Sequence, residues 1–236
     1  MSTAITPRML EVRTKILKNN DTVARAMRQR FRDAGCFVVS LVSSPGTGKT
    51  EFLKQTLAAL KSEFRVAAFV GDLRTDNDAA RLAQAGVPTK QIETGSICHL
   101  EAEMVERAMN ECGWNVDELD FLFIENVGNL VCPASYDLGE DLRLVLVSTT
   151  EGEDKPRKYP TIFNTADVAV VTKMDVAEAL EFDREAMHAS IQAVRPGMEM
   201  LEVSAKTGLG MSEWIDRLVD LRAGRPTAST TPPSPR

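Results

Sequence analysis

The chain has 236 residues, of which 43% are hydrophobic and 26% charged, and its formal net charge is −6. This composition is typical of a soluble domain with a sizeable core, and the acidic balance argues against a nucleic-acid partner, which usually leaves a basic footprint. No apolar run is long enough to span a membrane, and the first twenty residues lack the continuous apolar core of a signal peptide. These features predict a cytoplasmic protein.

Apolar residues at helical spacing predict a first, amphipathic helix over 8–33, and a β-branched run predicts a first strand at 36–43. The other predicted helices are 49–64, 76–86, 100–112, 176–194 and 210–224. The other predicted strands are 65–72, 119–126, 142–149, 166–173 and 198–205. Strands that alternate with helices indicate a parallel sheet covered on both faces, which binds ligands outside the carboxyl ends of its strands.

The domain organisation follows from composition. We expect an N-terminal helical segment at 1–34 and an α/β domain at 35–224. The Pro/Ser/Thr-rich tail at 225–236 is predicted to be disordered.

The stretch SSPGTGKT, residues 43–50, ends the first predicted strand and opens a predicted helix. It departs from the phosphate-loop pattern GxxxxGK[ST] at one position, because Ser43 stands where the first glycine is usual. In such loops the backbone N–H groups and the lysine hold phosphates, and the last hydroxyl coordinates Mg²⁺. The residues predicted to bind nucleotide are Ser44, Gly46, Thr47, Gly48, Lys49, Thr50 and Glu51, with Lys49 also catalytic. The fold class predicted is the three-layer α/β sandwich of P-loop NTPases, with a mainly parallel sheet.

Two later strand ends carry residues suited to reading a guanine base. TKMD (172–175) and SAK (204–206) resemble, in this order, the base-reading motifs of P-loop GTPases. Asp175 would accept hydrogen bonds from guanine N1 and N2, donors that adenine lacks, and Lys173 would cover the base. Thr172 stands where Asn is commoner, and its shorter side chain predicts weaker support of the loop. The predicted base site comprises Thr172, Lys173, Asp175, Ser204, Ala205 and Lys206.

Acidic residues end two other predicted strands. Asp72 follows AAFVG and Glu125 follows DFLFI. We expect Glu125 in the Mg²⁺ shell together with Thr50, and Asp72 at a Mg²⁺-bound water or at the attacking water. For each acid, the alternative is a strand-terminal residue that only caps a turn.

Cys98 and His99 are neighbours before a predicted helix, and Cys132 lies in the loop after the Glu125 strand. Two thiolates and an imidazole form a soft ligand set suited to Zn²⁺ or Ni²⁺, with a coordination position left open. Buried free thiols are also common, so the spacing alone leaves both interpretations open. The residues without an expected ligand role are Cys36, Cys112 and His188.

Several stretches together resemble the HypB family of SIMIBI-class P-loop GTPases, which help insert nickel into [NiFe]-hydrogenase and are related to UreG. They are SSPGTGKT, GD…TDNDAARL, TGSICHLEAEMV, ENVGNLVCPASYDLGE, TEGEDKPRKYPTIFNTADVAVVTKMD and VSAKTGLGM, with ILKNNDTVARAMRQRF similar to the family's leading helix. The resemblance implies a metal site at Cys98, His99 and Cys132. It also implies a GTP-promoted homodimer and delivery to a nickel chaperone partner and the hydrogenase large subunit.

The sequence thus predicts a slow, regulatory GTPase: a metallochaperone that uses GTP/GDP and Mg²⁺, binds Ni²⁺ or Zn²⁺, and assists nickel insertion during [NiFe]-hydrogenase maturation. Because Cys132 follows Glu125 in one loop, GTP is expected to reshape the metal site. The alternative is a GTP-dependent chaperone for an enzyme of the urease or cobalamin type, in which Cys98 and Cys132 are structural. The base-reading motifs argue against a third class, a small-molecule kinase.

Overall fold

A parallel sheet forms the centre of the computed structural model, which describes residues 7–72 and 77–225. The strand order within this described part is β3-β2-β4-β1-β5-β6-β7, and every pairing is parallel. The strands are β1 (Phe37–Ser43), β2 (Val66–Asp72), β3 (Thr89–Glu93), β4 (Phe121–Glu125), β5 (Leu142–Ser148), β6 (Val168–Thr172) and β7 (Glu199–Glu202). The α-helices are α1 (Pro7–Asp33), α2 (Lys49–Leu60), α3 (Asn77–Ala83), α4 (Ala102–Cys112), α5 (Lys155–Lys158), α6 (Pro160–Thr165), α7 (Arg184–Val194) and α8 (Met211–Ala223). Short 3₁₀ helices are η1 (Val116–Glu118), η2 (Cys132–Ser135) and η3 (Met174–Val176).

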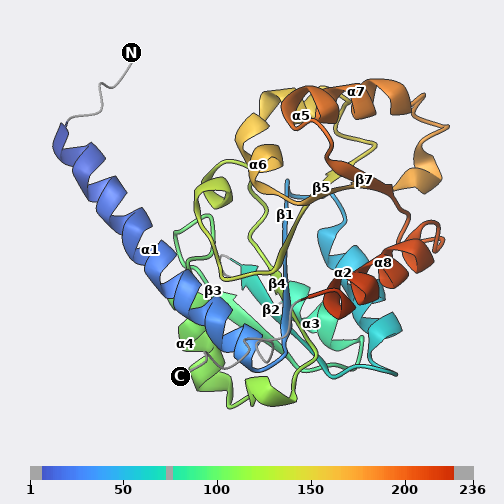
Figure 1. The fold of residues 1–236 in the computed structure, drawn as a ribbon. Helices are drawn as coiled ribbons and strands as arrows, with labels where there is room; N and C mark the ends of the chain where they lie inside the picture. Colours follow the sequence, from blue (N-terminus) through green and yellow to red (C-terminus); the bar gives the residue numbers. More distant parts are fainter. Residues whose placement is uncertain (1–6, 73–76, 226–236) are drawn as a thin grey trace, which may run out of the picture.

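The two faces of the sheet are covered by different helices (Figure 1). Alternate side chains of β1 point to opposite faces: Val39 packs in a cluster with residues of α2, α3 and α8, whereas Val38 packs in a cluster with residues of α1 and α4. A third cluster joins β5 and β6 to α6 and α7. The chain therefore adopts the predicted three-layer sandwich with a parallel sheet.

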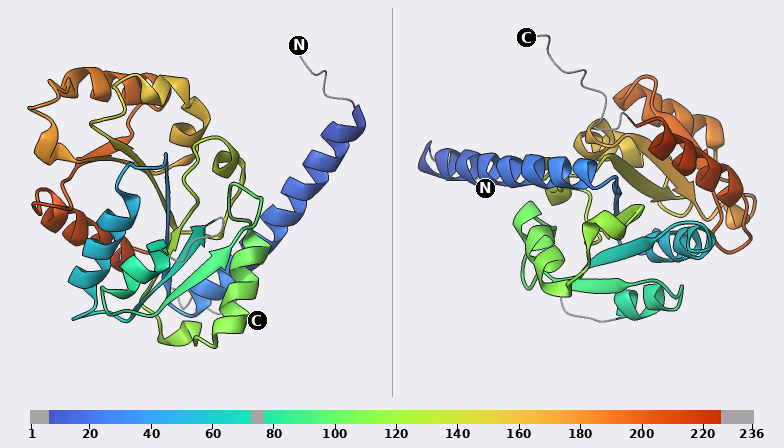
Figure 2. Two further views of the ribbon diagram at one scale, coloured as in Figure 1. Left: turned by 180° about the vertical axis from the view of Figure 1, so that it is seen from behind. Right: turned by 60° about the horizontal axis from the view of Figure 1, so that its bottom comes forward.

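Helix α1 has two halves with different surroundings. Ala24, Met27 and Phe31, in its second half, are buried in the cluster that also contains α4. The first half projects beyond the body of the domain (Figure 2), and Ile16 is 46% exposed there. In the part of the chain that the structure covers, no helix combines the length and the apolar character needed to cross a bilayer.

An ion pair joins the second half of α1 to the loop after η2. Arg28 Nη2 donates to Asp137 Oδ1 at 2.6 Å. Gly139 lies in the same loop at φ 81°, and a Cβ there would come within 2.9 Å of the Ala24 carbonyl oxygen. The loop therefore approaches α1 closely only because residue 139 is glycine.

Replacing Asp137 by Asn tests this pair. Burial raises the Asp137 pKa, but the Arg28 guanidinium and the Gly139 N–H outweigh burial and hold the pKa below its usual range. The stabilisation is therefore full above the unfolded pKa of about 3.9 and is lost as pH falls through the lower folded value. Asp137→Asn should lower the free energy of unfolding by about 1–2 kcal/mol at pH 7, and the difference should close at acidic pH in urea titrations. The exposed Asp154–Lys158 pair supplies the control, because Asp154→Asn should change nothing measurable.

Two element predictions need correction. The sequence predicts no strand at β3, which pairs only with β2 and buries a single apolar side chain, Ile92. The helix predicted over 176–194 begins only at Arg184, because Glu181 has φ 51° and the Asp183 side chain caps α7 at the Ala186 N–H.

The remaining differences are smaller. The helix predicted over 49–64 ends at Leu60, and the short helices α5 and α6 were not predicted. The predicted tail at 225–236 lies outside the described residues except for Arg225, as do residues 1–6 and 73–76.

Candidate functional site

The phosphate loop connects β1 to α2 at the carboxyl end of the sheet. Gly46 and Gly48 have φ angles of 77° and 94°, which favour glycine, and Gly48 precedes the first residue of α2. No side chain caps the N–H groups that open this helix, so these groups can bind an anion. Ser43, in place of the usual first glycine, is buried and donates its hydroxyl hydrogen to the Ser44 carbonyl.

A cavity of about 490 Å³ lies over this loop. It is lined by Ser43, Ser44, Pro45, Gly46, Thr47, Gly48, Lys49, Thr50, Glu51, Asp72, Asp78, Arg81, Val127 and Gly128. The structure thus brings all the predicted phosphate-loop residues and Asp72 to one cavity. Gly128, not predicted, packs on the loop so closely that a Cβ would come within 3.1 Å of Pro45. Asp78 and Arg81 were also missed, although TDNDAARL carries them.

Glu125 lies directly beneath the loop and is 1% exposed. Its Oε1 accepts hydrogen bonds from Lys49 Nζ at 3.0 Å and from Thr50 Oγ1 at 2.7 Å. Its other oxygen, Oε2, is buried and has no hydrogen-bond partner among the described residues. A carboxylate oxygen that is free to bind beside a threonine hydroxyl fits the chemistry of Mg²⁺, which prefers oxygen ligands.

Thr172 supports the phosphate loop from the opposite side. Its hydroxyl donates to the Thr47 carbonyl oxygen at 2.6 Å and is buried. The threonine hydroxyl therefore reaches the phosphate loop directly, and weaker support than an asparagine would give stays a prediction. The next residue, Lys173, has φ 61°, and its Cε lies 3.9 Å from where a Cβ on Gly48 would stand.

The two base-reading motifs meet in space. Ser204 Oγ donates to Asp175 Oδ1 at 2.8 Å, and the Met174 N–H donates to the Val203 carbonyl. Lys206 Nζ lies 4.0 Å from Asp175 Oδ2 and is largely exposed. The Asp175 carboxylate is thus oriented by SAK, and Ala205 lies between the two SAK residues that contact it.

Glu151 is a site residue that the sequence did not reveal. Its Oε2 accepts from the Ser148 N–H at 2.8 Å and from Thr47 Oγ1 at 2.9 Å, and Lys155 lies 3.3 Å from its Oε1. Burial raises its pKa, but these hydrogen bonds outweigh burial and hold the pKa below the usual range. Glu151 therefore fixes the loop to the end of β5, and its position just after that strand was the available signal.

Cys98, His99 and Cys132 lie together, with their ligand atoms all within 4.8 Å of one another. The sulfur atoms of the two cysteines are 3.0 Å apart. The His99 ring packs against Tyr136 in a tilted arrangement, with ring centroids 4.0 Å apart and an interplanar angle of 38°. Both His99 nitrogens are buried and accept or donate no hydrogen bond within the described part of the chain, although Glu101 Oε1 lies 3.5 Å from Nε2.

At this cluster the imidazole is ready to bind a metal, whereas the Cys98 thiol must first lose its proton. Burial lowers the His99 pKa below its usual value despite the nearby Glu101 carboxylate, so the imidazole is neutral at pH 7. The hydrogen bond with Cys132, together with burial, raises the pKa of the Cys98 thiol. A neutral imidazole with an unbonded nitrogen and two adjacent sulfurs fit a soft divalent cation, which would displace the thiol protons.

Asn126 connects the nucleotide and metal sites. Lys49 Nζ donates to the Asn126 carbonyl at 2.7 Å, and the Asn126 side-chain oxygen accepts from the Leu100 N–H at 3.0 Å. Leu100 follows His99 directly. The phosphate-loop lysine and the candidate metal ligands are therefore linked through one residue.

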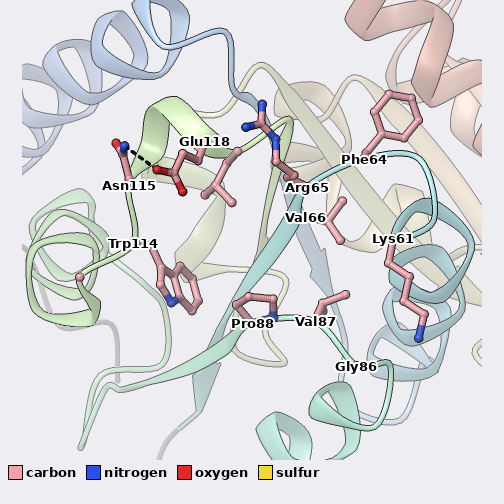
Figure 3. Close-up of a pocket in the computed structure, with 12 residues that line it drawn as sticks. Lys61, Phe64, Arg65, Val66, Gly86, Val87, Pro88, Trp114, Asn115 and Glu118 are labelled. Carbon is pink, nitrogen blue, oxygen red and sulfur yellow. Dashed lines mark hydrogen bonds between the residues drawn. The ribbon is translucent and has the colours of Figure 1, made fainter.

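The residues without an expected ligand role lie elsewhere. Cys36 is fully buried, and burial raises its pKa to about 12, while Cys112 is half-buried and His188 is exposed. A larger cavity of about 590 Å³ lies at the amino-terminal ends of β2 and β3 (Figure 3). None of the predicted site residues lines it; its walls include Val66, Val87 and Trp114. It therefore has no part in the site.

Comparisons with known proteins agree with this geometry. The family model described as "CobW/HypB/UreG, nucleotide-binding domain" matches residues 37–202. The hydrogenase maturation factor HypB of Azotobacter vinelandii is 48% identical over 210 residues, which cover 88% of this chain and 68% of the relative. The hydrogenase/urease maturation factor HypB of Helicobacter pylori strain 26695 is 40% identical, over 87% of this chain and 85% of the relative.

A solved structure gives the same result. The crystal structure of HypB from Helicobacter pylori in complex with nickel superposes with a TM-score of 0.82 at 38% identity, covering 90% of this chain and 99% of that one. The fold, the match to a nucleotide-binding domain and the sequence identity all indicate the same family. The chain belongs to the HypB family of hydrogenase maturation factors, within the CobW/HypB/UreG group of nucleotide-binding proteins.

Proposed function

We propose that this chain is a GTP-hydrolysing metallochaperone that binds nickel or zinc and assists nickel insertion during [NiFe]-hydrogenase maturation. The observation that carries the proposal is the pair of hydrogen bonds at Asn126, which join Lys49 to the segment bearing Cys98 and His99. The relatives support it, since they are named hydrogenase maturation factors and one was solved with nickel.

The nucleotide site has the following division of roles. Phosphate-loop N–H groups and Lys49 hold the phosphates, and Asp72 orients the attacking water. Thr50 and Glu125 would hold Mg²⁺, which when bound offsets charge on the β- and γ-phosphates. Asp175 and Lys173 select guanine. Because these groups mainly bind and orient, the expected activity is a slow, regulatory GTPase.

Coupling between the sites follows from the Lys49 contacts. In this structure Lys49 donates to both Glu125 and the Asn126 carbonyl. A γ-phosphate competes for the same ammonium hydrogens, so GTP and GDP favour different positions of Asn126. Since Asn126 also accepts from the Leu100 N–H, a shift there changes the position of Cys98 and His99, and with it the metal affinity.

The cellular setting belongs to the same proposal. Residues 35–224 act as the GTPase unit, preceded by the helical segment, and GTP promotes a homodimer. The protein works in the cytoplasm and exchanges nickel with a chaperone partner and the hydrogenase large subunit. The Helicobacter pylori relative is named a hydrogenase/urease maturation factor, which keeps a urease-type client as the second candidate.

Nickel titration tests the coupling. Wild-type protein should bind Ni²⁺ with affinities that differ at least about fivefold between GDP and a non-hydrolysable GTP analogue. Cys98→Ala should lose most of that affinity in both states because a thiolate ligand is missing, while binding of GDP stays unchanged. The measurement is competition against a chromophoric chelator, with oligomeric state read in parallel.

Cys112→Ala is the matched control, since this half-buried cysteine lies on α4 outside the cluster. It should behave as wild type. Equal nickel affinity with both nucleotides would refute the coupling. Unchanged metal content in Cys98→Ala and Cys132→Ala would make the cysteines structural and favour the alternative chaperone.

A further inference from the structure

Asn20 is a buried polar residue on α1, 4% exposed, in a helix turn whose neighbours face solvent. Its Nδ2 donates to the Asp137 carbonyl oxygen at 2.8 Å. Its Oδ1 accepts from the Ala102 N–H, also at 2.8 Å. One side chain thus uses both ends of its amide on two segments that are distant from it in sequence.

These two segments carry the candidate metal ligands. Ala102 opens α4 three residues after His99, and Asp137 lies two residues after η2 in the Cys132 loop, the segment that begins at Cys132 and continues beyond η2. The residue before Ala102, Glu101, makes no side-chain cap bond. Asn20 therefore supplies from α1 the acceptor that α4 lacks locally.

We propose that Asn20 is a positioning residue for the metal site: it fixes the distance between the Cys98–His99 segment and the Cys132 loop. The inference rests on the proposed metal-binding function of this cluster. Asn129 makes a direct bond between the same segments, from its Nδ2 to the Cys98 carbonyl at 3.2 Å. Asn20 and Asn129 contact the segments at different points, so together they limit how far the sulfurs can separate.

The fold has other means of holding α1 in place. Asn19 Nδ2 donates to Glu103 Oε1 at 2.6 Å, and apolar residues such as Met27 and Phe31 bury the same helix. Loss of Asn20 therefore removes one of the two links between the ligand segments and leaves the Asn129 bond, while α1 stays docked. Partners that orient metal ligands typically account for about 10–100-fold in affinity.

Two variants separate the roles of the amide. Asn20→Ala removes both hydrogen bonds. Asn20→Asp keeps an acceptor for the Ala102 N–H but places a carboxylate oxygen against the Asp137 carbonyl, so α4 stays capped while the bond from residue 20 to Asp137 is lost. Each should weaken Ni²⁺ binding about tenfold or more, with unchanged affinity for GDP. Asn19→Ala removes the neighbouring hydrogen bond between α1 and α4 and is the control. This variant should bind Ni²⁺ and GDP as wild type does.

A second measurement, made without metal, tests the position of the two thiols whether or not the cluster binds nickel. Phenylarsine oxide bridges two thiols that lie close together, and its reaction with Cys98 and Cys132 reports their separation without nickel. The reaction should be slower in Asn20→Ala and Asn20→Asp than in wild type, and Cys98→Ala should abolish it. Wild-type reaction rates in both Asn20 variants would overturn the inference. This outcome is decisive whether or not the titration of Cys98→Ala shows that the cluster binds metal. If Asn20→Ala does not fold, Asn20→Asp alone decides.

Discussion

Asp175→Asn is expected to lower the affinity for GDP and GTP by about 10³-fold or more, and to raise the affinity for xanthine nucleotides. The Asp175 carboxylate is oriented by Ser204 at 2.8 Å and offers two acceptors to the N1 and N2 hydrogens of guanine. An amide would place a donor against one of those hydrogens, and a buried donor without an acceptor is costly. Xanthine carries a carbonyl at the same position and would accept from the amide. Displacement of a fluorescent GDP by GTP, ATP and XTP gives the measurement.

Lys206→Ala is the comparison for this experiment. Its ammonium lies 4.0 Å from Asp175 Oδ2 and the side chain is 83% exposed. Exposed ion pairs contribute little, so the GDP affinity of this variant should stay close to that of wild type. A wild-type protein that binds ATP as well as GTP would contradict the assignment of the base site.

Lys49→Met should abolish GTP binding and also destabilise the nucleotide-free protein by about 3 kcal/mol. The second effect arises because Glu125 is 1% exposed and would lose its cationic partner at 3.0 Å. An uncompensated buried carboxylate costs more than the ion pair itself contributes. Urea unfolding of the nucleotide-free protein measures the loss.

Adding Glu125→Gln to the Lys49→Met variant separates two causes of its lower stability. One is the buried, unpaired carboxylate, and the other is the lost packing of the lysine side chain. With the carboxylate removed, the loss of unfolding free energy in the double variant should be about 1–2 kcal/mol smaller than the sum of the two single losses. Strict additivity would show that Lys49 and Glu125 do not stabilise each other in the folded protein.

The nucleotide site was predictable because its residues lie at strand ends in fixed local spacings. SSPGTGKT, TKMD and SAK each follow a strand, and parallel strands end at one edge of the sheet. The structure accordingly places Lys49 and Asp72 at one cavity, bonds Lys49 to Glu125 and pairs Asp175 with Ser204.

Other features depend on contacts that no local pattern encodes. Cys98 and Cys132 have no diagnostic spacing, so only family resemblance favoured the metal interpretation before the structure placed their sulfurs 3.0 Å apart. Glu151, Asn126 and Asn20 act through hydrogen bonds to backbone or side-chain atoms that are distant in sequence. The break at Glu181 was hidden because the apolar spacing continues through a left-handed residue.

The hydrogen bonds that build both sites join parts of the chain that are synthesised far apart. Lys49 and Glu125 are separated by 76 positions, and Asn20 and Asp137 by 117. Contacts over such distances form late and slowly, because the chain must close a long loop before it gains them. A nascent chain that has not yet reached β4 already carries the phosphate loop together with Cys98 and His99. It lacks Glu125, Asn126 and Cys132, so it can assemble neither site, and nucleotide and metal binding both wait for the same stretch of sequence.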